Sequence, residues 1–164
     1  MDSCIVQKVF GKLIQENNFE EMNKCAILSA RNVDVDDIND QVTNLLDRST
    51  EHVYTGIYSI ENCDNGELTN LLLPEYLNTL NPPSLPPCKL HLRKNCIIML
   101  IRNISINEGL CNVTRLLVID FFNHLLKCKI LTGDKCNIIV FLNRITLYGK
   151  NEYPFTLKRR QFPI

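Results

Sequence analysis

The sequence predicts an α+β protein in which a βα unit precedes a small β-barrel. Three observations favour this class: apolar residues recur at helical spacing near the amino terminus, short β-branched and aliphatic runs fill the second half, and a proline-dense stretch separates the two parts. The chain has 164 residues, of which 45% are hydrophobic, so it can bury a core.

The amino-terminal part contains two predicted helices and one predicted strand. Residues 5–14 carry apolar side chains at helical spacing, which predicts an amphipathic helix. Residues 25–30 (Cys-Ala-Ile-Leu-Ser-Ala) are typical of a short buried strand. After the polar turn 31–34, apolar residues recur at helical spacing from Val35 to Leu45, and acids crowd the first turn, where they suit the positive end of a helix dipole. Strand, turn and helix together predict a βα unit.

A different pattern begins at residue 53. Residues 53–60 are rich in β-forming side chains, and residues 62–66 (Asn-Cys-Asp-Asn-Gly) predict a loop. Residues 81–87 hold four prolines in seven residues, which excludes helix and central strand and marks the best candidate domain boundary. Beyond it, five short apolar runs predict the strands of a small β-barrel, at residues 89–92, 96–101, 115–119, 125–131 and 138–142. The last segment, residues 155–164, predicts a strand whose partner lies further along a longer chain.

The charges are divided between the two halves, although the formal net charge is zero. Residues 1–82 carry five Lys/Arg against fourteen Asp/Glu, a net charge of −9, and residues 83–164 carry thirteen against four, a net charge of +9. The basic half has the charge density of a surface that binds a polyanion. An equally weighted alternative is that the two halves neutralise each other.

The eight cysteines indicate a reduced, intracellular protein rather than a disulfide scaffold. They include no Cys-x-x-Cys pair and no histidine at zinc-finger spacing, so no metal site is predicted. The amino terminus has no signal-peptide pattern, and the longest apolar run, residues 96–101, is far shorter than the about 20 residues that span a bilayer. We therefore expect an intracellular, soluble protein, without a membrane partner, whose cysteines are small buried hydrophobes.

No catalytic residue is predicted, because no motif brings nucleotide or nucleophile chemistry together. A phosphate loop needs a second glycine upstream of Gly-Lys and a Ser or Thr after it, and neither Gly11-Lys12 nor Gly149-Lys150 has them. Residues 117–120 look like an apolar strand ending in a Mg²⁺-binding acid, but the following acid is missing. The chain itself is therefore expected to hold no cofactor.

Blocks of residues in the basic half follow one another at near-constant spacing. They include Leu85-Pro-Pro87, Met99-Leu-Ile-Arg-Asn103, Glu108-Gly-Leu-Cys-Asn112, Ile130-Leu-Thr-Gly-Asp-Lys135 and Lys158-Arg-Arg-Gln-Phe-Pro163. This string resembles the carboxy-terminal part of petite-integration-frequency (PIF-type) ATP-dependent DNA helicases, in particular their Helitron-like branch. The resemblance covers about residues 20–164.

The resemblance implies a fold in three parts. Residues 1–80 would be a lead-in helix and a partial second RecA-like domain, residues 85–150 an SH3-like barrel of the 2B type, and residues 151–164 a strand that re-enters the RecA-like domain. In the full-length family, ATP and Mg²⁺ are held by motor parts that this chain lacks. The resemblance thus implies a fragment of a 5′–3′ helicase, of transposon origin, that contacts single-stranded DNA. Its protein partners would be the missing motor domains, and it would act in the nucleus in DNA repair or recombination.

The same resemblance singles out nine polar or basic residues as candidates for contact with nucleic acid. Arg102 and Asn103 match a strand-end pair of the family, but such a pair is equally suited to hold backbone. Asn112 belongs to a polar hairpin shoulder, for which turn structure is the favoured interpretation. Residues 158–160 form the densest basic cluster, and such runs are also common on solvated faces and at docking sites. The full set is Arg93, Arg102, Asn103, Asn112, Thr114, Arg115, Lys158, Arg159 and Arg160.

The chain departs from the family at positions where glycine is usual. Asn95, Val113 and Asn137 stand there instead. Asn tolerates a left-handed backbone and Val does not, so a hairpin that needs positive φ at Val113 would be strained by about 1–2 kcal/mol. Ile138-Ile139 replaces polar residues and adds apolar surface to a strand. These changes are typical of relaxed selection on a decayed transposon remnant, which is one rival interpretation. The other is a non-enzymatic protein-interaction module, in which the barrel and the acidic βα unit dock to a protein partner.

Overall fold

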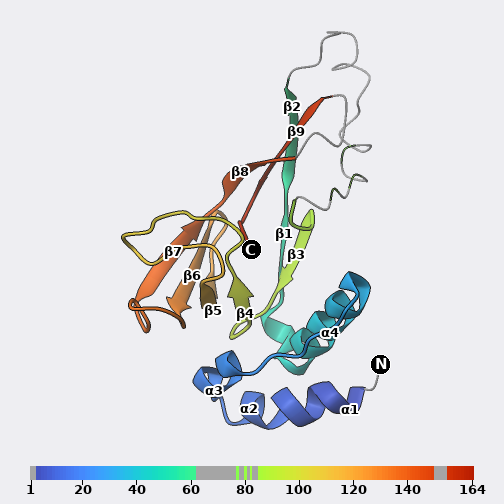
Figure 1. The fold of residues 1–164 in the computed structure, drawn as a ribbon, viewed down its shortest axis with the longest axis vertical. Helices are drawn as coiled ribbons and strands as arrows, with labels where there is room; N and C mark the ends of the chain where they lie inside the picture. The colour runs from blue at the N-terminus through green and yellow to red at the C-terminus, as the bar shows by residue number, and fades with distance from the viewer. Residues whose placement is uncertain (1–2, 62–76, 78–79, 81, 83–84, 150–154) are drawn as a thin grey trace.

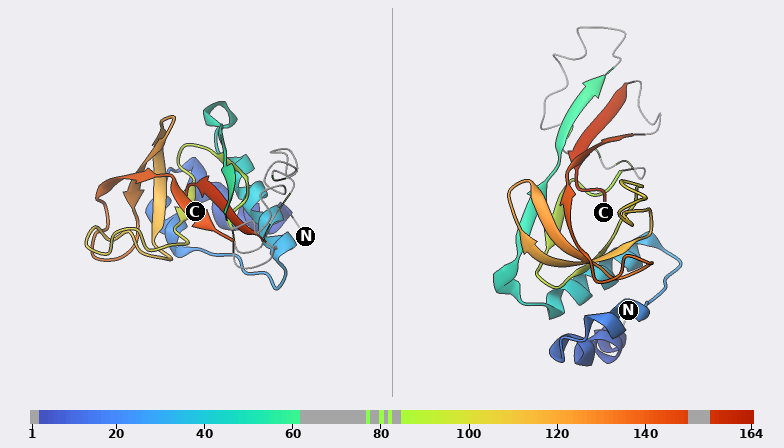
Figure 2. Two further views of the ribbon diagram at one scale, coloured as in Figure 1. Left: turned by 90° about the horizontal axis from the view of Figure 1, so that it is seen from above. Right: turned by 90° about the vertical axis from the view of Figure 1, so that its left-hand side faces the viewer.

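The computed structural model describes residues 3–61, 77, 80, 82, 85–149 and 155–164. The helices lie at one end of the molecule, and a β2–β9 strand pair extends toward the other end (Figure 1). The two views of Figure 2 show the carboxy terminus between this pair and a four-stranded sheet. Helices and antiparallel sheets are both present, so the predicted α+β class is confirmed.

The helical end is built from amphipathic segments, as the apolar spacing predicts. A continuous helical run comprises α1 (Ser3–Val6), a π-helical turn (Gln7–Gly11) and α2 (Lys12–Gln15), and is followed by α3 (Phe19–Lys24) and α4 (Asn32–Leu45). Their apolar faces meet in a small core of Val6, Phe10, Met22 and Ile38. Both predicted helices are therefore confirmed.

The predicted strand at residues 25–30 is wrong. The segment has no ladder partner in the described part of the chain, and Leu28 is 93% exposed. Ile27 packs against the helical core while its neighbours face solvent, so the burial still alternates as in a strand. Apolar side chains and an alternating pattern do not make a strand without a neighbour to accept its backbone hydrogen bonds.

The second part of the chain is β-structure, and every strand expected there forms. A 3-10 turn (Arg48–Thr50) leads into it. The strands are β1 (His52–Thr55), β2 (Ile57–Glu61), β3 (Lys89–Leu92), β4 (Ile97–Met99), β5 (Arg115–Phe121), β6 (Leu125–Ile130), β7 (Ile139–Asn143), β8 (Ile145–Tyr148) and β9 (Thr156–Gln161). The loop predicted at residues 62–66, and residues 81, 83 and 84 of the proline-dense stretch, lie outside the described residues.

The strands pair differently from the single barrel that the pattern predicts. They form a sheet in the order β4-β5-β6-β7, a sheet in the order β2-β9-β8 and the pair β1-β3, all antiparallel. Within the described residues no ladder joins β7 back to β4, so the pairing does not describe a closed barrel. The partners of β9 are β2 and β8, so the expectation that its partner lies further along the chain is also wrong.

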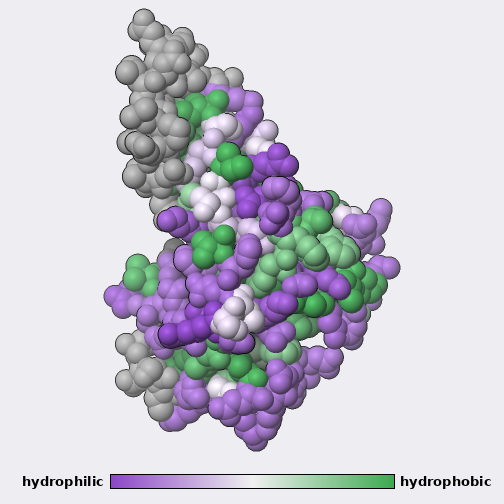
Figure 3. Space-filling model, turned by 180° about the vertical axis from the view of Figure 1, so that it is seen from behind, coloured by the Kyte–Doolittle hydropathy of each residue, from purple (hydrophilic) through white to green (hydrophobic). Residues whose placement is uncertain are grey.

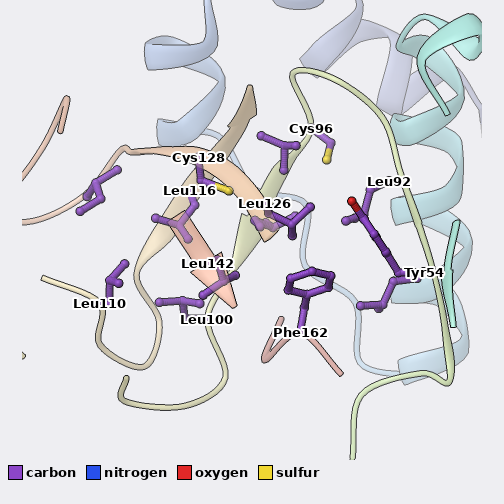
Figure 4. Close-up of a cluster of buried hydrophobic side chains, with 14 of the residues drawn as sticks. Tyr54, Leu92, Cys96, Leu100, Leu110, Leu116, Leu126, Cys128, Leu142 and Phe162 are labelled. Atoms are coloured by element: carbon purple, nitrogen blue, oxygen red, sulfur yellow. The ribbon is translucent and has the colours of Figure 1, made fainter. Parts of the chain in front are cut away.

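The main core lies against the inner face of the four-stranded sheet (Figure 4). Strand alternation turns Leu126, Cys128 and Ile130 of β6 inward, and Phe162 closes the cluster from the carboxy-terminal segment, with its ring 4.9 Å from that of Tyr54. Each fully buried Leu, Ile or Phe side chain contributes about 1.5–3 kcal/mol relative to exposure. The carboxy-terminal segment is therefore an integral part of the core.

Two of the cysteines behave as the buried hydrophobes that the sequence predicts. Burial raises the pKa of the Cys96 thiol to about 11 and that of the Cys128 thiol to about 12. Cys136, in contrast, is exposed. Among the helices in the described ranges, none is long and apolar enough to cross a membrane.

We expect thiol reagents to distinguish these cysteines in the native protein. Because Cys136 is exposed, it should be alkylated readily, whereas Cys96 and Cys128, which are buried and have raised thiol pKa values, should react only when the protein unfolds. Peptide mapping by mass spectrometry after timed alkylation measures this. Equal rates for Cys96 and Cys136 without denaturant would contradict it.

The hairpin strain expected at Val113 is present. Its φ is +72°, and the other two non-glycine positions singled out in the sequence, Asn95 and Asn137, have φ of +68° and +70°. All three residues therefore occupy the left-handed region that glycine adopts freely.

Replacing Val113 by glycine should stabilise the protein. Relief of about 1–2 kcal/mol of strain is offset by an entropy cost of about 0.5–1 kcal/mol that glycine adds, so Val113→Gly should raise the free energy of unfolding by up to about 1.5 kcal/mol. Chemical denaturation measures it. Asn137→Gly is the matched control and should gain less, because Asn already tolerates this conformation.

Candidate nucleic-acid interface

The basic run near the carboxy terminus forms β9, and a strand divides such a run between two faces. Lys158 and Arg160 point to one side of the sheet, and Leu157, Arg159 and Gln161 to the other, which is fully buried. The sequence alone does not show which of the three adjacent cations is buried. Strand geometry does, because it turns Arg159 to the side opposite Lys158 and Arg160.

Cross-strand register brings further residues onto the outer side of β9. Lys158 lies between Ser59 of β2 and Tyr148 of β8. Arg160 lies between Ile57 and Thr146 in the same way. We name this surface the β9 face, and its members are Ile57, Ser59, Thr146, Tyr148, Lys158 and Arg160.

The β9 face combines one unpaired cation, one paired cation and an aromatic ring. Arg160 is exposed, and within the described residues it has no ion-pair partner. Lys158 forms an ion pair with Glu61, and its ammonium group lies 5.4 Å from the centre of the Tyr148 ring. Tyr148 is itself exposed. The exposed guanidinium of Arg160 can contact a phosphate, and the exposed ring of Tyr148 can stack on a base, so the pair suits single-stranded nucleic acid.

Arg159 is a correction to the predicted interface, because its side chain is completely buried. Its guanidinium lies 4.4 Å from the centre of the Tyr58 ring and donates hydrogen bonds to the Tyr58 hydroxyl and to the backbone carbonyls of Pro86 and Leu80. Burial, as the largest cause, raises the pKa of Tyr58 to about 12. Arg159 thus fastens the proline-dense segment to the sheet and does not reach a phosphate.

Arg93 is a second correction, because it is only 5% exposed. Its guanidinium donates to the Glu51 carboxylate at 2.7 Å, to the Thr43 carbonyl at 2.7 Å and to the Leu46 carbonyl at 3.3 Å. The bonds to Thr43 and Leu46 cap the carboxy-terminal end of α4, where carbonyls lack helical partners. Arg93 therefore joins the helical end to the β-structure.

The hairpin residues Asn103, Thr114 and Arg115 are engaged with the protein itself. The Asn103 side-chain oxygen accepts the backbone N–H of Asn112 at 2.7 Å. The Thr114 hydroxyl donates to the Gly109 carbonyl at 3.1 Å, and the Arg115 guanidinium donates to the Asn23 carbonyl. The contacts of Asn103 and Thr114 lie within the hairpin, and that of Arg115 joins the hairpin to α3.

Arg102 and the Asn112 side chain remain exposed at this hairpin. The backbone N–H of Ile101 donates to the Pro163 carbonyl at 2.9 Å. Arg102, the next residue, therefore lies beside the carboxy-terminal segment. For Arg102, as for Arg160, no ion-pair partner exists among the described residues.

Sequence analysis missed two residues of this region, Tyr148 and Arg144. The guanidinium of Arg144 lies 5.2 Å from the ring centre of Tyr54 and 5.3 Å from that of Phe162, and it donates to the Thr55 carbonyl. The signal for Tyr148 was available, because alternation in β8 turns Leu147 inward and Tyr148 outward. No sequence signal places Arg144 over two rings that are distant in the chain.

The described residues do not fit a nucleotide site. Gly11-Lys12 lies inside the continuous helical run and not in a loop between a strand and a helix. Asp120 forms an ion pair with Lys94 at 2.9 Å, and this pair lowers the pKa of its carboxyl.

Comparison with known proteins shows similarity to Pif1 helicases. Residues 75–121 match the family model described as the DNA helicase Pif1, 2B domain. No curated protein matches the chain.

Solved Pif1 helicases share the fold. The helicase from Candida albicans superposes with a TM-score of 0.55 at 19% identity, covering 82% of this chain and 33% of that one. Unliganded Pif1 from Bacteroides sp superposes with a TM-score of 0.51 at 16% identity, covering 81% of this chain and 36% of that one. A structure of two coordinating Pif1 helicases at forked double-stranded DNA superposes with a TM-score of 0.52 at 16% identity, covering 81% of this chain and 25% of that one. The chain thus spans about a quarter to a third of these proteins, and the predicted resemblance to Pif1-type helicases is confirmed.

Removing the Arg93 guanidinium should destabilise the protein strongly. In Arg93→Met the buried or part-buried carbonyls of Thr43 and Leu46 and the Glu51 carboxylate lose a charged donor, so the free energy of unfolding should fall by about 2–3 kcal/mol. Urea denaturation at neutral pH measures the loss. Arg48→Met, at an exposed position without an ion pair in the described residues, is the matched control and should change little.

The same variant should alter the response to acid. The hydrogen bond from Arg93, followed by that from His91, holds the pKa of Glu51 below its ordinary value of 4.5. This contribution to stability is present above pH 4.5 and is lost as the pH falls through the lowered folded value. Arg93→Met should therefore lose less stability than the parent protein between neutral and acidic pH.

Proposed function

We propose that this chain, which contains a match to the Pif1 2B domain, binds single-stranded DNA through the β9 face without hydrolysing ATP. Its role is that of a segment of a PIF-type 5′–3′ helicase, in which other parts would supply the motor. In this proposal, the lead-in helix and a partial RecA-like domain comprise residues 1–80. The 2B-type insertion comprises residues 85–150, and a re-entry strand comprises residues 151–164.

The observation that carries the proposal is the register of β9 between β2 and β8. It sets Arg160 and Lys158 on the same exposed side as Tyr148, over three adjacent strands. Cations that follow a strand neutralise phosphates without reading sequence, and an exposed ring stacks on any base. The relative solved at forked DNA supports the choice of nucleic acid as the ligand.

The proposed contacts are few, and this sets the expected affinity. Glu61 already neutralises part of the charge of Lys158, and Arg93 and Arg159 are occupied inside the protein. We therefore expect weak, sequence-indifferent binding with dissociation constants of about 10⁻⁴–10⁻⁶ M at physiological salt.

A protein-interaction module is the second candidate, because α4 presents exposed Asp36, Asp37 and Asp40 to solvent. An acidic helix face of this kind suits a basic protein partner. Co-purification of one stoichiometric partner, together with the absence of any oligonucleotide shift, would favour this candidate. A decayed remnant is the third, and a poorly dispersed NMR amide spectrum would favour it.

Fluorescence anisotropy with a labelled oligothymidine over a salt series tests the DNA proposal. Binding should weaken as salt rises, and Arg160→Gln should reduce the slope of log K against log salt by about 0.7, the value for one phosphate contact on a single strand. Arg48→Gln, on the remote 3-10 turn, is the matched control and should leave affinity and slope unchanged.

An affinity that is constant between low and high salt would exclude phosphate contacts and overturn the proposal. Equal losses in Arg160→Gln and Arg48→Gln would show that overall charge, and not the β9 face, determines binding.

A further inference from the structure

Strand β7 is one of the two edge strands of the four-stranded sheet, and β4 is the other (Figure 1). In the described part of the chain β7 pairs with β6 along one edge and with no strand along the other. An unpaired edge presents a row of backbone donors and acceptors that another strand can use.

The register identifies which backbone groups face outward. The Ile130 N–H donates to the Ile138 carbonyl at 3.0 Å, and the same register continues along β6 and β7. Because hydrogen bonding alternates along an antiparallel strand, Val140 and Leu142 direct their backbone groups to β6. Ile139, Phe141 and Asn143 direct theirs outward, where no described residue meets them.

The side chains on this edge are also exposed and apolar. Ile139 is 52% and Phe141 55% exposed, and they stand directly opposite Lys129 and Lys127 on the same face of the sheet. The molecule seen from behind shows hydrophobic patches on the side where this sheet lies (Figure 3). Residues 137–143 contain no charge, no proline and no glycine, so the edge lacks the protection that such residues give.

We propose that β7 is a self-association site, at which a second copy of this chain adds its own β7 in antiparallel orientation. A two-fold axis at Phe141 sets this residue opposite its counterpart and sets Ile139 opposite Asn143 of the second copy. All three residues have outward-facing backbone groups, so each exchanges both N–H···O bonds with its partner. The two sheets then join into one continuous sheet.

Electrostatics favour a second copy as the occupant of this edge. Residues 137–143 carry no charge, so the two β7 segments meet without like-charge repulsion between their own side chains. The two Phe141 rings form an aromatic cross-strand pair, which stabilises a sheet beyond simple burial. The aliphatic stems of Lys127 and Lys129 flank the rings while their ammonium groups reach water.

Sedimentation velocity of the full chain without DNA, over a wide range of protein concentration, tests the proposal. The weight-average mass of the parent protein should double as concentration rises. Phe141→Lys should remain monomeric, because it places two like charges opposite each other at the axis. Met99→Lys is the matched control: Met99 lies on β4, at the opposite edge of the same sheet, with 47% exposure, and this variant should still dimerise.

A second variant separates loss of pairing from loss of folding. Asn143→Pro removes an outward-facing N–H that β6 does not use, so circular dichroism should show an unchanged fold while the dimer is lost. A parent protein that stays monomeric throughout overturns the proposal. So does a dimer that survives both β7 variants, or one that is lost equally in Met99→Lys. Because DNA is absent, the result is independent of the proposed function.

Discussion

The buried guanidinium of Arg159 is the constraint on which the β9 face depends. It holds β9 to Tyr58 of β2 and to the carbonyls of Leu80 and Pro86, which are distant in the chain. Because side chains alternate along a strand, burying Arg159 forces Lys158 and Arg160 to the opposite side. An interior contact thus determines which cations the protein offers to a ligand, and a buried guanidinium without its acceptors would be costly.

The internal use of cations also changes the meaning of the charge distribution. The second half of the chain carries a net charge of +9, but Arg93 caps α4, Arg144 lies over two rings, and Lys158 is paired with Glu61. Glu51 and Glu61 neutralise Arg93 and Lys158, and the guanidinium of Arg144 lies against Tyr54 and Phe162, so none of these three cations is offered freely to a polyanion. The two exposed guanidinium groups left at the candidate interface suit weak binding, and net charge alone overstates the affinity for DNA.

Local patterns predicted the helices and the second-half strands well, because apolar spacing reflects which side of each element is buried. The left-handed backbone at Asn95, Val113 and Asn137 was indicated by the family resemblance, in which glycine is usual at these positions, and not by the local patterns. They failed at residues 25–30, where a strand-like pattern has no neighbouring strand. The prediction of nucleic-acid contact also failed at Arg93 and Arg159. The sequence does not show whether an arginine donates to a backbone carbonyl inside the protein or faces solvent.

The sequence by itself determined the α+β class, the helices, the second-half strands and the resemblance to Pif1-type helicases, because these follow from local periodicity and from motifs in fixed order. Only the tertiary structure decided that β3 pairs with β1, that β9 lies between β2 and β8, and that β7 is left at an edge. Strand pairing joins residues far apart in the chain, so its outcome depends on the whole packed core and not on any single segment.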